Sequence, residues 1–85
     1  PHMGWNTLHS ISEHPLMRGF SVTDYVYFVH SFAVAPDKFS LAQCHYGNDF
    51  AAVIGKDNVA GAQFHPERSG KTGARLLQNF LEWQL

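Results

Sequence analysis

A histidine and a carboxylate lie two residues apart in the segment Gln63-Phe64-His65-Pro66-Glu67. Side chains of residues i and i+2 on an extended chain point to the same side, and the proline after His65 steers that residue away from the helical region. We therefore expect the Glu67 carboxylate to reach the His65 ring. It would hold one ring nitrogen as a hydrogen-bond donor and leave the other free as a base, which is the base-and-orienter pair of a nucleophilic triad.

A second interpretation of the same pair needs no chemistry. His65 can be an ordinary histidine at a strand end, and Glu67 a solvated acid at a helix start, because a short motif alone is only a hypothesis. The five-residue segment, however, resembles the closing signature of the class I (triad) glutamine amidotransferases. The resemblance implies that His65 and Glu67 complete a Cys-His-Glu triad, and that glutamine is the substrate to be hydrolysed.

Two further segments resemble one branch of that family, the glutaminase subunit of imidazole glycerol phosphate synthase. They are Pro1-His2-Met3-Gly4-Trp5-Asn6 and Tyr27-Phe28-Val29-His30-Ser31-Phe32. The resemblance implies that ammonia passes to a cyclase subunit, the partner protein, for use in histidine biosynthesis. It also implies that Ser31 and Phe32 border the glutamine pocket, although the branch more often has a tyrosine hydroxyl at the position of Phe32. The residues implied to face the cyclase subunit are Trp5, Asn6, Tyr27 and Arg68.

Cys44 is the only cysteine in the sequence. A triad amidotransferase needs a thiolate on a tight strand-to-helix turn, usually in a Gly-x-Cys-x-Gly pattern, where backbone N–H groups stabilise the oxyanion. Cys44 has no glycine beside it and lies within an expected strand, so we expect a small buried hydrophobe rather than a nucleophile. The resemblance then implies that residues 1–85 are the C-terminal portion of a single glutamine amidotransferase domain, inactive alone for want of its nucleophile.

Two other classes of protein stay open. The chain could be a non-catalytic interaction module, or a self-associating one, derived from the same fold, because without a nucleophile it could only bind. It could also be an unrelated small α+β domain that carries the motif by chance. Similar segments at both ends of the chain argue against the last of these.

The composition narrows the class of protein. Hydrophobic residues make up 45% of the 85 residues and charged residues 15%, which is typical of a globular domain. A net charge of -1 without a Lys/Arg stripe argues against a nucleic-acid partner, and no apolar run is long enough to span a membrane. None of the six histidines has zinc-ligand spacing, so we expect no metal site. No cofactor is implied, and the single cysteine fits a reducing, cytoplasmic location.

The pattern of apolar residues predicts an α+β fold for this stretch, as part of the α/β domain of the family. Residues 1–8 are expected to form a short strand or an ordered loop, and residues 9–22 a loop or a short helical turn. Residues 25–33 are an unbroken β-branched and aromatic run, which predicts a strand buried on both faces. Shorter strands are expected in an antiparallel meander at residues 41–46, 50–54 and 59–64.

Residues 71–84 predict an amphipathic helix that packs on this meander. Ser69 is the expected N-cap, and Gly73 in the first turn is expected only to weaken the helix start. The expected buried face holds Ala74, Leu77 and Leu81, widened by Leu76, Phe80 and Trp83.

Overall fold

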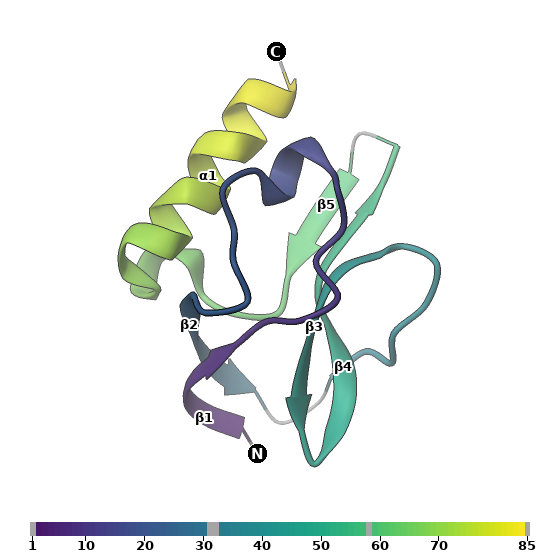
Figure 1. Cartoon of the computed structure of the whole chain (residues 1–85), viewed down its shortest axis with the longest axis vertical. Coiled ribbons are helices and arrows are strands. Elements are labelled where there is room, and N and C mark those ends of the chain that lie inside the picture. Colours follow the sequence, from purple (N-terminus) through teal and green to yellow (C-terminus); the bar gives the residue numbers. More distant parts are fainter. Residues whose placement is uncertain (1, 31–32, 58, 85) are drawn as a thin grey trace.

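The computed structural model describes residues 2–30, 33–57 and 59–84, and it has the α+β fold that the sequence predicts. An antiparallel ribbon of β1 and β2 lies beside an antiparallel meander in the order β3-β4-β5, with α1 packed near both (Figure 1). Within the described residues, none of the helices combines the length and the apolar character needed to cross a membrane. The strands are β1 (His2–Thr7), β2 (Tyr25–His30), β3 (Ser40–Tyr46), β4 (Asn48–Lys56) and β5 (Val59–Ala62), and the helices are the 3-10 turns η1 (Pro15–Met17) and η2 (Pro66–Arg68) and the α-helix α1 (Gly70–Gln84).

The β1–β2 ribbon confirms a strand near the start of the chain and corrects the burial expected of β2. Side chains alternate along β2, so that Val26 and Phe28 are fully buried while Tyr25 and Val29 are exposed. The sequence predicts burial on both faces because an unbroken apolar run is typical of a covered strand. In the described residues only one face of β2 is covered. The prediction was wrong because the composition of a strand does not reveal whether a second layer packs on it.

The meander confirms the three predicted strands and supplies about half of the buried apolar residues in the described chain. Gly47 closes the β3–β4 hairpin with a φ of 76°, a backbone conformation that glycine adopts without strain. Phe28 of the ribbon packs edge-on against Phe50 of β4 and against Phe64 just beyond β5, with ring centroids 5.4 and 5.9 Å apart. This aromatic cluster joins the two sheets across the core.

Helix α1 confirms the predicted helix but buries only one edge of the expected face, where Leu76 is buried and Trp83 packs against the core. The sequence places Ala74, Leu77 and Leu81 on the buried face. In the structure all three are exposed, and Leu77 and Leu81 keep 48% and 60% of their surface accessible. The helix is therefore rotated about its axis relative to the expectation. The buried positions are Leu76, which was expected, and Gly73 and Asn79, which were not.

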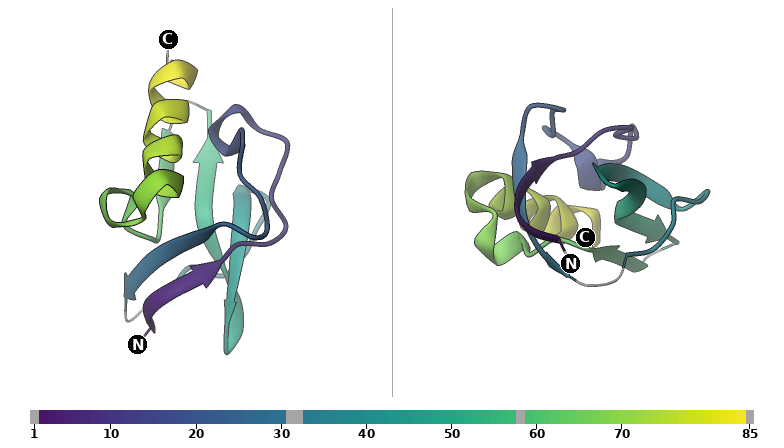
Figure 2. Two further views of the ribbon diagram at one scale, coloured as in Figure 1. Left: turned by 60° about the vertical axis from the view of Figure 1, so that its left-hand side comes forward. Right: turned by 90° about the horizontal axis from the view of Figure 1, so that it is seen from below.

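The rotation of α1 follows from hydrogen bonds made by Asn79. Its side-chain amide donates to the carbonyl oxygens of Leu16 and Arg18, at 2.9 and 2.8 Å, and so fixes the helix against η1 and the residue after it. An apolar hollow of about 140 Å³ lies between α1 and the end of β5, and so separates this part of the helix from the meander. Figure 2 shows α1 running alongside the meander. Hydrophobic periodicity does not predict an inward-facing amide, which is why it selects the wrong face.

Candidate functional site

Residues 63–69 cross from the meander to the ribbon and carry the expected catalytic pair. The backbone N–H of Gln63 donates to the carbonyl oxygen of Ala52 in β4 at 2.8 Å, and that of His65 donates to Tyr27 in β2 at 3.0 Å. His65 is extended, with φ of -94° and ψ of 101°, as the proline after it favours. The pair is thus held where the two sheets meet.

The side chains of His65 and Glu67 contact each other, with His65 Nδ1 lying 3.1 Å from Glu67 Oε2. An ionised carboxylate can only accept hydrogen bonds, so Nδ1 is the donor and Nε2 is left as the basic ring nitrogen. The His65 side chain is 40% exposed, which gives a substrate access to the ring. This arrangement can take up or release a proton at Nε2 while the carboxylate stabilises the charged imidazolium.

The pKa of the Glu67 carboxyl is lowered from its ordinary value. The main cause is a hydrogen bond from its own backbone N–H, and the bond from the His65 ring is the second. The positive charge of the adjacent Arg68 adds a smaller effect in the same direction. Glu67 is therefore ionised at neutral pH, which is the state that orienting His65 requires.

Gly73 allows the first turn of α1 to pack closely against the segment that holds the pair. A Cβ at this position would overlap the carbonyl group of Pro66 in η2. From the sequence, Gly73 is expected only to weaken the helix. The structure shows that a residue without a side chain is needed there, because α1 packs closely against η2. The one available signal is the glycine itself, since a glycine inside a helical pattern often marks a close approach.

The four residues expected to face a partner do not share one surface. Trp5 and Tyr27 are cross-strand neighbours on the outer side of the ribbon, where their rings meet edge-on with centroids 5.6 Å apart. Trp5 is 54% exposed, and Arg68 is exposed in η2. Asn6, the next residue along β1, points to the other side, and its amide donates to the His45 carbonyl at 3.2 Å. The structure brings Trp5 and Tyr27 together and sets Asn6 apart.

Ser31 and Phe32, expected to border a glutamine pocket, lie outside the described residues. The residue before them, His30, ends β2 with its ring packed against Phe50 at a centroid distance of 5.0 Å and against Phe28 at 5.6 Å. His30 is therefore part of the aromatic packing, and the pocket border stays a prediction.

Cys44 is fully buried in β3, as expected for a small hydrophobe. Burial raises the pKa of its thiol to about 11. At that pKa only about one thiol in 10⁴ is ionised at neutral pH. Cys44 thus lacks both the exposure and the charge of a catalytic thiolate.

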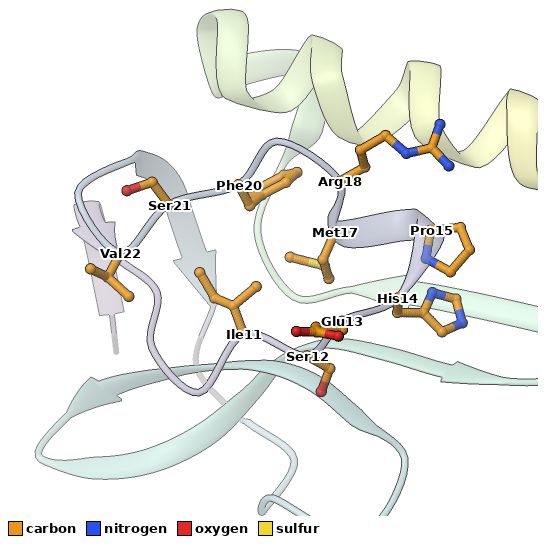
Figure 3. Close-up of a pocket in the computed structure, with 10 residues that line it drawn as sticks. All are labelled: Ile11, Ser12, Glu13, His14, Pro15, Met17, Arg18, Phe20, Ser21 and Val22. Atoms are coloured by element: carbon orange, nitrogen blue, oxygen red, sulfur yellow. The ribbon is translucent and has the colours of Figure 1, made fainter.

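A hollow of about 550 Å³ lies within the segment that connects β1 to β2, and none of the expected site residues lines it (Figure 3). Ile11, Met17 and Phe20 form its apolar side and pack on the core. The ring of His14, at its edge, packs edge-on against Trp83 at 5.5 Å and accepts a backbone N–H of η1. The side chains that line this hollow therefore have a role in packing, and these contacts do not call for a bound ligand.

A second cluster of histidine and carboxylate lies at the end of the β3–β4 hairpin. Asp49 Oδ1 is 2.9 Å from His45 Nδ1 and 3.1 Å from His9 Nε2, and the three side chains are 39% to 64% exposed. The hydrogen bond from His45 is the main cause that lowers the pKa of Asp49. Among the residues that the structure describes, no group of three or more such side chains has the geometry of a metal site.

Comparison with known proteins relates the whole chain to one family. The family model described as Glutamine amidotransferase class-I matches residues 1–83. The imidazole glycerol phosphate synthase subunit HisH of Colwellia psychrerythraea is 56% identical over 82 residues, which cover 96% of this chain and 36% of the relative. The subunits of the same name from Vibrio vulnificus and Photorhabdus laumondii are 52% and 56% identical over 82 residues, covering 96% of this chain and 40% and 41% of those relatives. The chain thus spans 36% to 41% of the length of these curated relatives.

Proposed function

The chain belongs to the class-I glutamine amidotransferase family, and on that premise we propose that it supplies the base and the orienter of a glutaminase site. The observation that supports this most directly is the 3.1 Å contact between His65 Nδ1 and Glu67 Oε2. The segment that bears the pair is hydrogen-bonded to both sheets, which gives the pair a fixed direction. In this proposal residues 1–85 are the C-terminal portion of one amidotransferase domain.

The proposed reaction is the hydrolysis of glutamine to glutamate and ammonia. His65 takes the thiol proton of the cysteine at Nε2, the resulting thiolate attacks the side-chain amide carbon, and the C–N bond breaks as His65 gives that proton to the leaving ammonia. His65 then takes a proton from the water that attacks the thioester and returns it to the cysteine sulfur as the C–S bond breaks and glutamate is released. Glu67 orients the ring throughout and stabilises its charged form. The three side chains account for every proton, so no cofactor is proposed.

The nucleophile in this proposal comes from sequence outside these 85 residues. Cys44 is buried with a pKa of about 11, which leaves almost no thiolate at neutral pH. The chain alone is therefore expected to release no ammonia from glutamine. Ammonia release that disappears in Cys44→Ser would overturn this expectation.

A chimera tests the role of the pair directly. Residues 1–83 would replace the matching segment of the Colwellia psychrerythraea relative, which is 56% identical, and glutamine hydrolysis would be measured. The chimera is expected to be active. His65→Ala should lower kcat by roughly 10²–10⁴-fold, the usual contribution of a general acid–base residue, and Glu67→Gln should lower it less.

The exposed histidine His9 provides the matched control for this experiment. His9→Ala removes an imidazole that also pairs with a carboxylate, at 3.1 Å, but belongs to the hairpin cluster. It should leave kcat unchanged. Equal losses in His9→Ala and His65→Ala, or full activity in His65→Ala, would contradict the proposal.

For the wider role, we propose that ammonia is passed to a cyclase subunit in histidine biosynthesis, in the cytoplasm. The support is that the relatives are named as subunits of imidazole glycerol phosphate synthase. The exposed Trp5, packed against the half-buried Tyr27, and the exposed Arg68 on η2 offer aromatic and cationic groups of the kind enriched at interfaces. In the chimera, Trp5→Ala and Arg68→Ala should weaken binding of the cyclase subunit in isothermal titration, while Lys38→Ala should not.

A self-associating module is the second candidate function, and the exposed apolar surface supports it. Val59 on β5 is 68% exposed, and Leu77 and Leu81 on α1 are 48% and 60% exposed. Within the described strands, β5 pairs only with β4, so that its outer edge can pair with another strand. Light scattering of the 85-residue chain should therefore give a mass above that of a monomer. A monomer at high concentration would argue against this candidate.

A further inference from the structure

Ser69 is a buried polar residue whose hydroxyl bonds the segment of the catalytic pair to the ribbon. The residue is 2% exposed. Its Oγ donates to the carbonyl oxygen of His65 at 2.7 Å and accepts from the backbone N–H of Tyr27 at 2.9 Å. A hydroxyl has one proton to donate, and here that proton goes to His65.

These bonds hold the His65 peptide on both sides. Its N–H donates to the carbonyl oxygen of Tyr27 at 3.0 Å, and its carbonyl accepts from Ser69. Tyr27 in turn uses both of its backbone groups here, the N–H toward Ser69 and the carbonyl toward His65. The direction in which the His65 side chain leaves the backbone is thereby set relative to β2.

The structure assigns Ser69 a different task from the helix cap expected from the sequence. Its hydroxyl bonds run to the loop and to the strand, whereas the helix bonds to its backbone carbonyl, which accepts from the N–H of Gly73 at 3.1 Å. We infer that Ser69 is a positioning residue, which holds the His65 backbone so that the ring meets Glu67 through Nδ1. This inference rests on the proposed function, in which that pair is the base and the orienter.

Removing the hydroxyl would leave two peptide groups without their partner. The Tyr27 N–H would lose its acceptor and the His65 carbonyl its donor, in surroundings where Ser69 itself is buried. Leaving such groups unsatisfied costs more than the bond is worth, so the segment would shift to find other partners. The His65 ring would then lose its fixed approach to Glu67.

The tautomer of the His65 ring reports this contact without any enzyme assay. Neutral histidine in solution favours the form protonated at Nε2, whereas an Nδ1–H bond to the Glu67 carboxylate favours the other form. ¹⁵N NMR of the 85-residue chain, at a pH where the ring is neutral, measures the proportion of the two tautomers. We expect Nδ1–H to predominate in the native chain and to fall about twofold or more in Glu67→Ala.

Ser69→Ala should lower the Nδ1–H proportion as Glu67→Ala does, and Ser69→Thr, which keeps the hydroxyl, should restore it. The aromatic shifts of Phe28 and Phe50, in the core, monitor that each variant is folded. An unchanged proportion in folded Ser69→Ala would overturn the inference. Should Ser69→Ala fail to fold, Ser69→Gly removes the hydroxyl at a helix start that accepts glycine, and an unchanged tautomer there would overturn it equally.

The same variants separate this inference from the proposed function. In the chimera with the Colwellia psychrerythraea relative, Ser69→Ala should lower kcat while Ser69→Thr retains it. A chimera without activity, in which the tautomer of His65 still depends on Ser69, would overturn the proposed function and leave the positioning role intact. An active chimera in which Ser69→Ala changes neither kcat nor the tautomer would do the reverse.

Discussion

Two places in this molecule bring histidine and carboxylate together at almost the same distances. His65 lies 3.1 Å from Glu67, and His45 and His9 lie 2.9 and 3.1 Å from Asp49. In both places the side chains are partly exposed and the pKa of the carboxyl is lowered. Side-chain geometry alone therefore does not distinguish a candidate active site from a surface cluster.

The difference lies in what holds each group. The peptide of His65 is bonded on both sides, to Tyr27 and to the buried hydroxyl of Ser69, and Gly73 brings a helix against the same segment. The backbone of the hairpin cluster is bonded as well, through the pairing of His45 with Asp49 and through the two bonds between His9 and Gln43. What the first region has besides backbone bonds is the buried Ser69 hydroxyl and the close packing of α1. A catalytic group needs a fixed direction as well as a partner, and the first region has the additional support.

The largest effect that separates the two regions is expected from Gly73→Ala. The new Cβ would overlap the Pro66 carbonyl, so that helix and segment must move apart. We expect the free energy of unfolding to fall by about 2–3 kcal/mol, as for overpacked cores, measured by urea denaturation.

Gly61→Ala is the matched control for that measurement, because a Cβ there would meet Ile54 at an ordinary 3.6 Å. It should cost far less than Gly73→Ala. Equal losses of unfolding free energy in Gly73→Ala and Gly61→Ala would show that the close packing of α1 against η2 does not specifically stabilise the first region.

Acidification should lower the stability of the fold by a smaller amount, and here the hairpin cluster should contribute more than the His65–Glu67 pair. The pKa of Glu67 and that of Asp49 are both lowered in the folded chain. Each carboxylate therefore stabilises the fold above about pH 4, the unfolded value, and this contribution is lost as the pH falls through the lowered native pKa.

The urea midpoint of the native chain should decrease between neutral and acid pH. Asp49→Asn should make this decrease smaller, and by more than Glu67→Gln does. The reason is that Asp49 accepts from two rings and Glu67 from one. A larger flattening in Glu67→Gln would reverse the ranking and indicate that the His65–Glu67 pair contributes more to stability that is lost in acid than the hairpin cluster does.

The smallest effect is expected from His9→Ala in the 85-residue chain. His45 keeps its bond to Asp49, and the backbone of residue 9 keeps both of its bonds to Gln43, at 2.7 and 2.8 Å. The urea midpoint should move little. A loss as large as that of Gly73→Ala would mean that the cluster fixes the loop after β1, and the contrast between the two regions would disappear.

The local features of the site were predictable from neighbours in the sequence. The proline after His65 favours the extended backbone that lets the ring reach Glu67, and the contact is present at 3.1 Å. The meander and the helix follow from strand composition and from apolar periodicity. These predictions succeed because each depends on interactions within a few residues.

The features that failed or were missed all depend on distant partners. Ser69 reaches Tyr27, which is 42 residues away, and the buried face of α1 is set by Asn79 bonding to a segment more than 60 residues earlier. Gly73 needs to be small only because η2 folds back onto it. A sequence pattern records which faces are apolar and gives no list of the carbonyl groups that a buried polar side chain will meet.

The bonds of Asn79 also order the events of folding in time. Its carbonyl partners in residues 16 and 18 lie 63 and 61 residues earlier, so closing that loop costs roughly 4 kcal/mol of chain entropy. In a growing polypeptide these carbonyls emerge from the ribosome long before the amide that will bind them, and water must solvate them meanwhile. We therefore expect α1 to dock late, with Asn79→Ala chiefly accelerating unfolding and barely slowing refolding.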